Sequence, residues 1–339
     1  PALPPQACTE LGIERGTVQD LPEIEFGSSG SFMLTLDGKP RLVRLVPWSL
    51  RERGFSVEGD PLGLVDQRER LWRGSVEPGG LRISCSRLRD GWWGRVVGDD
   101  GQSWMLEPWG EHTAVYNSLD ALECGGICGV EDWMIKDSRG PVIANAGGPG
   151  GGGGLQVCGL AAEADWAFFQ TWGADALGRV ESVLDAMNLQ YESEVGITHD
   201  LSYFLVRTSS GDDPYGSITN PSSLLSQFGS WWNANQQLIE RDVAHLFTGK
   251  DLDGGVIGVA YLGVICTSNA YGLDQEFGNF NCRTDLIAHE LGHNWSADHC
   301  DCGNPQYTMN PSITCANQFS PSQTVADITG FRSTRSCLE

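Results

Sequence analysis

Residues 284–295 read TDLIAHELGHNW, and this stretch decides how the second half of the chain folds. Thr284 or Asp285 can cap a helix here, because the residues that follow are good helix formers. A spacing of four residues then places His289 and His293 on one face of the helix, one turn apart. Both imidazoles reach the same ion, so the stretch predicts a helix that carries two ligands of a metal site.

Two further residues complete the pattern of a catalytic metal site. Glu290 follows the first histidine, so its carboxylate points beside the metal and can take a proton from a zinc-activated water. A catalytic zinc has three protein ligands and one open position, and His299 supplies the third ligand if the chain turns back after the helix. Chance alone would place H-E-x-x-H in on the order of one in a hundred chains with this few histidines. We therefore expect Zn2+ on His289, His293 and His299, with Glu290 as general base.

The remaining histidines lack this spacing. His112 and His199 are expected to be solvated or satisfied by hydrogen bonds. His245, within RDVAHLFTG, is expected to be packed structure. We expect no metal at any of them.

The sequence around the spaced histidines resembles a known family. Residues 289–299, HELGHNWSADH, are similar to the metzincin signature H-E-x-x-H-x-x-G-x-x-H, and YTMNP, with Met309, is similar to the Met-turn beneath the zinc in that clan. Within the clan the chain most resembles the reprolysin or adamalysin branch, which includes the ADAM proteases. Supporting similarities lie in NLQYESEVGI, DDPY, DVAHLFTG, GVAYLGVIC and FSPSQ, so the resemblance covers roughly residues 157–339.

The resemblance implies an α/β metzincin catalytic domain, with a mixed sheet and helices, that binds Zn2+ and hydrolyses extended polypeptides. It also implies that the substrate pairs with a strand at the edge of the sheet. The apolar run GGVIGVAYLGVIC suits a buried or edge strand. Within this run, the residues expected to pair with substrate are Gly258, Val259, Ala260 and Tyr261.

The signature departs from the family at one position. The family has glycine at the turn between the second and third ligands, where a positive φ is easiest, and this chain has Ser296. Serine is small and adopts such a turn at modest cost. Asn294-Trp295-Ser296 also forms an N-glycosylation sequon, which we interpret as coincidence because a glycan there would obstruct the cleft.

The chain divides at residues 147–154, GGPGGGGG, which contain only glycine and proline and are typical of a flexible linker. Before the linker, residues 1–146 alternate apolar and polar positions and carry turn signals at Asp37-Gly38 and Asp99-Asp100-Gly101. This pattern predicts a β-sandwich or barrel. By resemblance to the family, it is a β-rich prodomain.

After the linker, residues 155–339 alternate helices and strands and form the predicted catalytic domain. Helical spacing predicts a long helix within residues 174–195 and a second helical stretch over residues 222–247. Between them, LSYFLVRT predicts a strand over residues 201–208. The second part is therefore expected to be α/β.

Composition narrows the possible partners. The 339 residues suffice for about two domains, and no apolar run approaches the roughly 18 residues that cross a bilayer. With 22 Lys and Arg against 44 Asp and Glu, the formal charge of -22 repels nucleic acid and anionic membranes. We expect a polypeptide substrate, no nucleic acid and no membrane span, and the oligomeric state stays open.

Eleven cysteines are typical of an extracellular, disulfide-bonded protein. The first residues, PALPPQACTE, lack the segments of a signal peptide, so we expect the sequence to begin after one was removed. Resemblance to the family suggests a bridge between Cys266 and Cys337. It also suggests two bridges around the metal loop, among Cys282, Cys300, Cys302 and Cys315.

Five cysteines remain, an odd number, so one thiol has no partner within this set: Cys8, Cys85, Cys124, Cys128 and Cys158. GGICGVED around Cys128 resembles the cysteine-switch segment of ADAM prodomains, in which a thiolate fills the open zinc position. Alternatively, Cys128 pairs locally, and the nearby Cys124 could exchange roles with it. Cys128 is thus our candidate for a fourth zinc ligand in a latent form.

Taken together, the sequence predicts a secreted zinc endopeptidase in zymogen form. One alternative is an extracellular structural or adhesive protein that keeps the zinc while its cleft stays covered. The absence of a dibasic site near the linker leaves this alternative open. A metal-dependent hydrolase of other substrates is a third interpretation, which the metzincin features disfavour.

Overall fold

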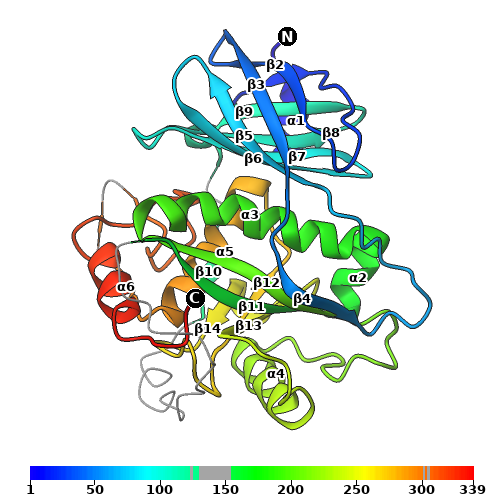
Figure 1. The fold of residues 1–339 in the computed structure, drawn as a ribbon, viewed down its shortest axis with the longest axis vertical. Coiled ribbons are helices and arrows are strands. Elements are labelled where there is room, and N and C mark those ends of the chain that lie inside the picture. The colour runs from blue at the N-terminus through cyan, green and yellow to red at the C-terminus, as the bar shows by residue number, and fades with distance from the viewer. Residues whose placement is uncertain (123–124, 130–153, 301, 304–305) are drawn as a thin grey trace.

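Two β-sheets with a long helix between them make up the fold (Figure 1). The computed structural model describes residues 1–122, 125–129, 154–300, 302–303 and 306–339. The N-terminal part comprises the described residues up to 129, and the C-terminal part comprises those from 154 onward. Among the described residues, no helix combines the length and the apolar character that a membrane crossing needs.

The first sheet has eight strands, all antiparallel, in the order β1-β9-β8-β7-β6-β5-β3-β2. They are β1 (Thr17–Gln19), β2 (Gly30–Leu36), β3 (Lys39–Trp48), β5 (Leu71–Glu77), β6 (Leu81–Leu88), β7 (Gly91–Val97), β8 (Ser103–Trp109) and β9 (His112–Asn117). A side chain joins the two outer strands, because the Gln19 amide donates to the Thr35 carbonyl and accepts from the Thr35 N–H, both at 2.8 Å. The sheet thereby closes around an apolar interior that includes Trp72 and Trp92.

The expected hairpins of the N-terminal part are present. Asp37 and Gly38 connect β2 to β3 with φ values of 47° and 74°. A two-residue hairpin turn of this kind needs positive φ at both central residues, which aspartate and glycine tolerate best. The second turn signal, Asp99-Asp100-Gly101, lies between β7 and β8 as expected.

The second sheet is mixed and has seven strands in the order β10-β14-β15-β13-β11-β12-β4. They are β4 (Arg51–Glu58), β10 (Ile127–Cys128), β11 (Gln156–Ala164), β12 (Ile197–Val206), β13 (Val243–Thr248), β14 (Val256–Ala260) and β15 (Tyr271–Gln275). Only β14 and β15 pair antiparallel. Both outer strands, β4 and β10, come from the N-terminal part, which the sequence analysis did not anticipate.

Six α-helices lie in the described residues: α1 (Pro5–Leu11), α2 (Trp166–Trp172), α3 (Ala176–Glu194), α4 (Pro221–Asn235), α5 (Phe280–Asn294) and α6 (Thr324–Arg332). Short 3-10 helices are η1 (Ser118–Asp120), η2 (Gly173–Asp175) and η3 (Asp253–Gly255). Helix α3 agrees with the predicted long helix and contacts strands of both sheets.

The helix expected over residues 222–247 was wrong in its second half. Helix α4 ends at Asn235, and VAHLF belongs to β13. Every residue of β13 is buried, because this strand lies inside the sheet with neighbours on both sides. A continuous apolar run of this length does not distinguish a buried strand from a helix.

Three disulfides join described cysteines: Cys266–Cys337, Cys282–Cys315 and Cys300–Cys302. The first was suggested by resemblance, and the other two connect the four cysteines expected around the metal loop. Cys124 lies outside the described residues, as do residues 147–153 of the linker.

Helix α5 carries the H-E-x-x-H sequence and begins about one turn earlier than expected. Its cap is Asn279, whose side chain accepts from the Cys282 N–H at 3.0 Å. The predicted caps, Thr284 and Asp285, lie buried within the helix. The prediction was wrong because asparagine caps as well as either of them and stands before a longer run of helical residues.

A carboxylate of the N-terminal part also contacts the start of α5. The buried Glu107 side chain, on β8, accepts from the Phe280 N–H at 3.1 Å and from the Tyr116 hydroxyl at 3.0 Å. N–H groups in the first turn have no partner within the helix, and negative charge there is favourable. Burial is the main cause that raises the pKa of Glu107 to about 7.

The C-terminal end of α5 is held by a buried hydrogen-bonded network. His245 is fully buried, with Nδ1 2.6 Å from Asp274 Oδ2 and Nε2 2.8 Å from Asn294 Oδ1. The Asn294 amide in turn donates to the carbonyls of Tyr261 and Tyr271, at 2.8 and 3.1 Å. The acceptor residue of the sequon, Asn294, is therefore buried and hydrogen-bonded, which agrees with the interpretation of the sequon as coincidence.

Replacing Glu107 with Gln tests the buried carboxyl. A folded-state pKa of about 7 against 4.5 for a free carboxyl means that its stabilising contribution is complete below 4.5 and is lost as the pH rises through about 7. We expect the Tm of the unmodified chain to fall more steeply, relative to that of Glu107→Gln, between about pH 5 and about pH 7. Thermal unfolding at stepped pH measures both slopes, and equal slopes would contradict the assignment.

Replacing His245 with Ala tests the network at the other end of α5. The substitution leaves a buried carboxylate and a buried amide oxygen without their donor, so we expect a loss of about 2–4 kcal/mol in unfolding free energy. Urea denaturation measures this loss. His112→Ala is the matched control, because His112 is exposed, and it should change stability by less than about 0.5 kcal/mol. Similar values for the two variants would refute the anchoring role.

Candidate metal centre

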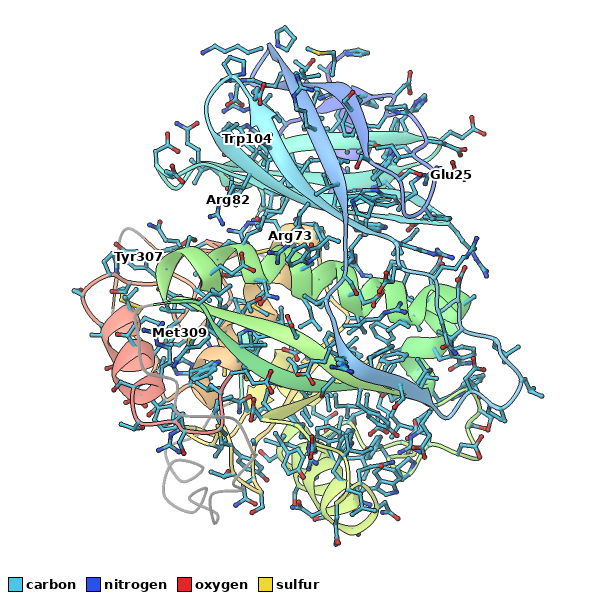
Figure 2. All side chains as sticks on the ribbon, viewed as in Figure 1. Glu25, Arg73, Arg82, Trp104, Tyr307 and Met309 are labelled. Carbon is cyan, nitrogen blue, oxygen red and sulfur yellow. A yellow bond between two sulfur atoms is a disulfide. The ribbon has the colours of Figure 1, made fainter. Side chains whose placement is uncertain are left out.

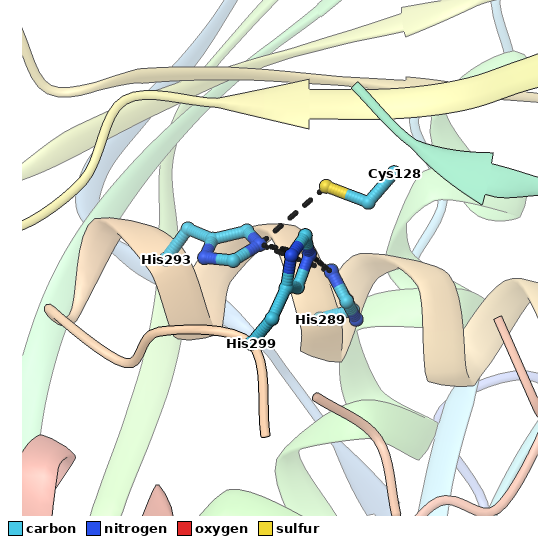
Figure 3. Close-up of side chains that lie close together, drawn as sticks. All are labelled: Cys128, His289, His293 and His299. Atoms are coloured by element: carbon cyan, nitrogen blue, oxygen red, sulfur yellow. Dashed lines mark hydrogen bonds between the residues drawn. The ribbon is translucent and has the colours of Figure 1, made fainter. Parts of the chain in front are cut away.

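The structure brings together the three histidines that the sequence singled out. His289 and His293 lie one turn apart on α5, and His299 reaches the same point from the segment after the helix (Figure 3). The chain turns back through Ser296, whose φ is 72°. The positive φ that the family meets with glycine is thus present here on serine, and the departure in sequence does not displace the third histidine.

Backbone carbonyls orient two of the rings. His289 Nδ1 lies 2.6 Å from the Thr308 carbonyl oxygen, and His293 Nδ1 lies 2.8 Å from the Ala297 carbonyl oxygen. A carbonyl oxygen only accepts, so each Nδ1 carries the hydrogen and donates it. Each Nε2 is left with a lone pair directed at the common point, as a metal ligand requires.

The spacing of the Nε2 atoms fits a tetrahedral ion. Those of His289 and His293 lie 3.0 Å apart, and that of His299 lies 3.3 and 3.2 Å from them. Ligand nitrogens about 2.0–2.1 Å from a tetrahedral zinc are about 3.3 Å from one another. Two Nε2 lone pairs at this distance repel unless a cation lies between them, so the donor set fits a metal ion.

Burial keeps these rings in their neutral, ligating form. It lowers the pKa of His289 to about 3, with a further contribution from the neighbouring His299. Burial followed by the two neighbouring imidazoles lowers the pKa of His293 well below its usual value, and burial lowers the pKa of His299 as well. No proton therefore competes for these nitrogens near neutral pH.

Glu290 lies buried beside the histidines on α5. Its Oε1 has no hydrogen-bond partner among the described residues, and its Oε2 lies 3.7 Å from Cys128 Sγ. Burial, then the nearby Asp274 carboxylate, raises its pKa well above the usual value. The neighbouring strand leaves room for this carboxyl only because it has Gly258, where a Cβ atom would come within 2.6 Å of Oε1.

Met309 is fully buried and lies on the loop between α5 and α6, where Figure 2 labels it. A Cβ atom at Gly292 would come within 2.5 Å of its sulfur, so the methionine packs directly against the helix between the two ligands. This contact explains why the spacer of H-E-L-G-H contains glycine. The resemblance alone assigned Met309, and Gly292 was missed although it stands in the same motif.

Cys128 is the fourth group near the common point. Its sulfur lies 3.4 Å from His293 Nε2, and the four donor atoms of Cys128, His289, His293 and His299 all lie within 4.8 Å of one another (Figure 3). Sulfur approaches from the side opposite the helix. The set of three imidazoles and one thiol is a donor set that suits tetrahedral zinc.

The segment that carries Cys128 lies between two backbone neighbours, strand β14 on one side and residues 311–313 on the other. Strand β10 pairs parallel with β14, and the Gly129 N–H donates to the Gly258 carbonyl at 2.8 Å. On the other side the Cys128 N–H donates to the Pro311 carbonyl at 3.2 Å, and the Ile313 N–H donates to the Gly126 carbonyl at 3.0 Å. The segment is thus held by backbone hydrogen bonds on both sides.

Glycines on both sides of Cys128 allow this close fit. A Cβ atom at Gly126 would come within 2.3 Å of the Ile257 side chain, and one at Gly129 within 2.9 Å of Val256. The sequence signal for this fit is the run GGICG itself, whose glycines were quoted only as part of a resemblance.

The candidate substrate residues form a strand next to the edge of the sheet, and that strand is covered by β10. Gly258, Val259 and Ala260 belong to β14, and Tyr261 follows directly. The side of β14 that does not face β15 is taken by β10. The N-terminal part thus contributes both the thiol beside the histidines and the strand on this edge.

Support for the site also comes from residues that the sequence analysis did not single out for function. The Asp285 carboxylate accepts from the Thr308 hydroxyl at 2.7 Å and from the Asn317 N–H at 2.8 Å. Thr308 is the residue whose carbonyl orients His289. Asp285 therefore holds the loop whose Thr308 carbonyl orients His289. In the sequence, only the helical spacing between Asp285 and His289 could have indicated this role.

Comparison with known proteins agrees with this geometry. The sequence model of metallo-peptidase family M12, of reprolysin type, matches residues 154–325, which is just over half of the chain. A zinc metalloproteinase of Deinagkistrodon acutus, recombinant fibrinogenase II, is 37% identical over 91 residues. That match covers 24% of this chain and 39% of the relative, so the two are similar over well under half of either length. The chain belongs to metallo-peptidase family M12, among the reprolysin-type metzincins.

Proposed function

We propose that the chain is a secreted zinc endopeptidase held in a latent form by Cys128. The observation that carries the proposal is the convergence of three Nε2 atoms and one thiol sulfur on one point, with a buried carboxyl beside it. Family membership favours an enzyme over a structural or adhesive protein. The disulfides of the C-terminal part suit an extracellular location.

His289, His293 and His299 would hold the zinc through Nε2. Bound there, zinc would polarise the scissile carbonyl and lower the pKa of a water molecule. Glu290 accepts a proton from the attacking water and delivers it to the leaving amine. Its carboxyl is placed for both transfers, because it lies next to the ligands and its Oε1 has no hydrogen-bond partner within the described part of the chain.

Latency follows from what the segment around Cys128 covers. The thiolate would fill the position that water needs, and β10 takes the edge of β14 on which an extended polypeptide would pair. The proposed organisation is a prodomain over residues 1–146, a Gly-rich linker over 147–154 and a catalytic domain over 155–339. Hydrolysis of polypeptides then requires that residues 125–129 leave their position between β14 and residues 311–313.

Replacing Glu290 with Ala tests the general base. The residue moves a proton and is not a ligand, so the variant should retain about one zinc per chain while its turnover falls by about 100-fold or more. Zinc analysis and cleavage of a denatured protein measure the two effects, both in the Cys128→Ser background so that latency does not mask the result. Glu240→Ala, at an exposed glutamate, is the control. Unchanged turnover in Glu290→Ala would exclude the mechanism.

Replacing Cys128 with Ser tests latency without any cleavage. A neutral hydroxyl is a much weaker zinc ligand than a thiolate, so we expect basal peptidase activity to rise by about tenfold or more. Cys8→Ser is the matched control, since Cys8 lies far from the histidines in sequence and is not part of the donor cluster. An increase in the control and none in Cys128→Ser would show that the wrong thiol was chosen.

A further inference from the structure

We infer that the N-terminal part is a permanent component of the folded peptidase and stays bound to the C-terminal part after the linker is cut. This inference goes beyond the proposed latency, which concerns only residues 125–129 at the metal site. It rests on contacts of the N-terminal part with the sheet, with α3 and with α5.

The first contact is a shared sheet. Strand β4 adds to the edge of β12 in parallel register, with the Leu201 N–H donating to the Leu50 carbonyl at 2.7 Å and Tyr203 bonded to Glu58. The chain leaves β4 through Gly59, where a Cβ atom would come within 2.1 Å of the Val206 carbonyl oxygen. Removing β4 would expose the backbone edge of a long, largely buried strand, which favours aggregation.

The second contact is a set of buried ion pairs on α3. Arg51 donates to Glu181 at 2.5 Å, and Arg73 donates to Asp185 at 2.8 Å. Both carboxylates are at most 2% exposed, and Figure 2 shows Arg73 between the first sheet and α3. Losing one partner of a buried ion pair is strongly destabilising, because the remaining charge is left without compensation. Helix α3 therefore depends on arginines of the N-terminal part.

Helix α3 also takes part in an aromatic contact between the two parts. The guanidinium of Arg179 lies 4.1 Å from the ring centre of Trp93 and 4.6 Å from that of Trp172. Trp93 comes from the N-terminal part and Trp172 from the C-terminal part, and Arg179 is fully buried between them. Leu71, Trp93 and Met105 of the N-terminal part share one apolar core with α3 and α5. This interface resembles the interior of a single domain.

The third contact supports the metal site itself. Glu107 accepts from the first N–H of α5, and the Asn279 amide that precedes this helix donates to the Gly12 carbonyl at 3.1 Å. Arg95, which is 3% exposed, donates to the Asn317 carbonyl at 3.0 Å. Asn317 bonds to Asp285, which fixes the loop behind His289. The N-terminal part thus helps to hold the helix and the loop that orient the ligands.

Two events must be distinguished, the withdrawal of residues 125–129 and the departure of the whole N-terminal part. Removal of a prodomain would combine them. Withdrawal of residues 125–129 breaks their backbone hydrogen bonds to β14 and to residues 311–313. It also uncovers the histidines and the edge of β14. Departure of the whole N-terminal part would in addition break the shared sheet, the ion pairs and the support of α5. Activation therefore proceeds by local movement of the Cys128 segment, with the eight-stranded sheet retained.

The test is to cut the linker and measure whether the two fragments stay together. A recognition sequence for a site-specific protease is inserted into residues 147–154, and the purified chain is cut at neutral pH. We expect the fragments to elute together in size-exclusion chromatography with light scattering, near the 36.8 kDa of the intact chain plus the insertion. Denaturing electrophoresis without reductant must show two fragments, and a Cys124→Ser background removes any bridge through that cysteine.

Separation of the fragments in native buffer, whatever the state of the C-terminal fragment, would overturn the inference. Mass is the readout, so the result does not depend on Cys128 being a ligand or on peptidase activity. Failure of this inference is therefore distinguishable from failure of the proposed function.

Charge reversal locates the holding contacts. In the cut chain, Arg73→Glu should weaken the association by at least about tenfold, because it places a negative charge against buried Asp185. Arg44→Glu is the matched control, since Arg44 is 60% exposed and its partner Glu77 lies in the same N-terminal part. Should Arg73→Glu fail to fold, Arg51→Gln gives the same comparison at Glu181. Retention equal to the control in both variants would contradict the role of α3.

Discussion

The close approach of three imidazole nitrogens is the constraint on which the rest of the structure depends. Three Nε2 atoms at 3.0–3.3 Å repel one another in the absence of a cation, so their rings must be fixed by the surrounding protein. Carbonyl oxygens of Thr308 and Ala297 fix two rings. Helix α5 is in turn held at its start by Asn279 and Glu107, and at its end by a network through His245.

Much of this centre could be predicted from local sequence. Four-residue spacing on a helix fixes where His289 and His293 point, and a small residue such as Ser296 permits the turn that returns His299. The family resemblance added Met309 and the pairing of Cys266 with Cys337, which spacing alone does not give. Alternation and turn residues were sufficient for the hairpins of the first sheet, because a two-residue turn carries its own backbone requirement.

The remainder depends on contacts between distant segments, which leave no local pattern. Nothing in Arg51–Glu58 distinguishes a strand of the first sheet from one that adds to β12. The start of α5 was misplaced because Thr284, Asp285 and Asn279 are comparable caps, and tertiary contact with Glu107 favours the earlier one. The same holds for β13, whose apolar run is compatible with a helix and is fixed as a strand by its pairing with β11 and β15.

In the N-terminal part, one segment supplies the thiol and the strand that covers β14, while the remainder contacts and supports the C-terminal part. The most direct measurement is zinc K-edge X-ray absorption on the intact, uncut chain. The account predicts three nitrogen ligands at about 2.0–2.1 Å and one sulfur at about 2.3 Å, with the sulfur absent in Cys128→Ser. A first shell of nitrogen and oxygen alone in the intact chain would contradict it.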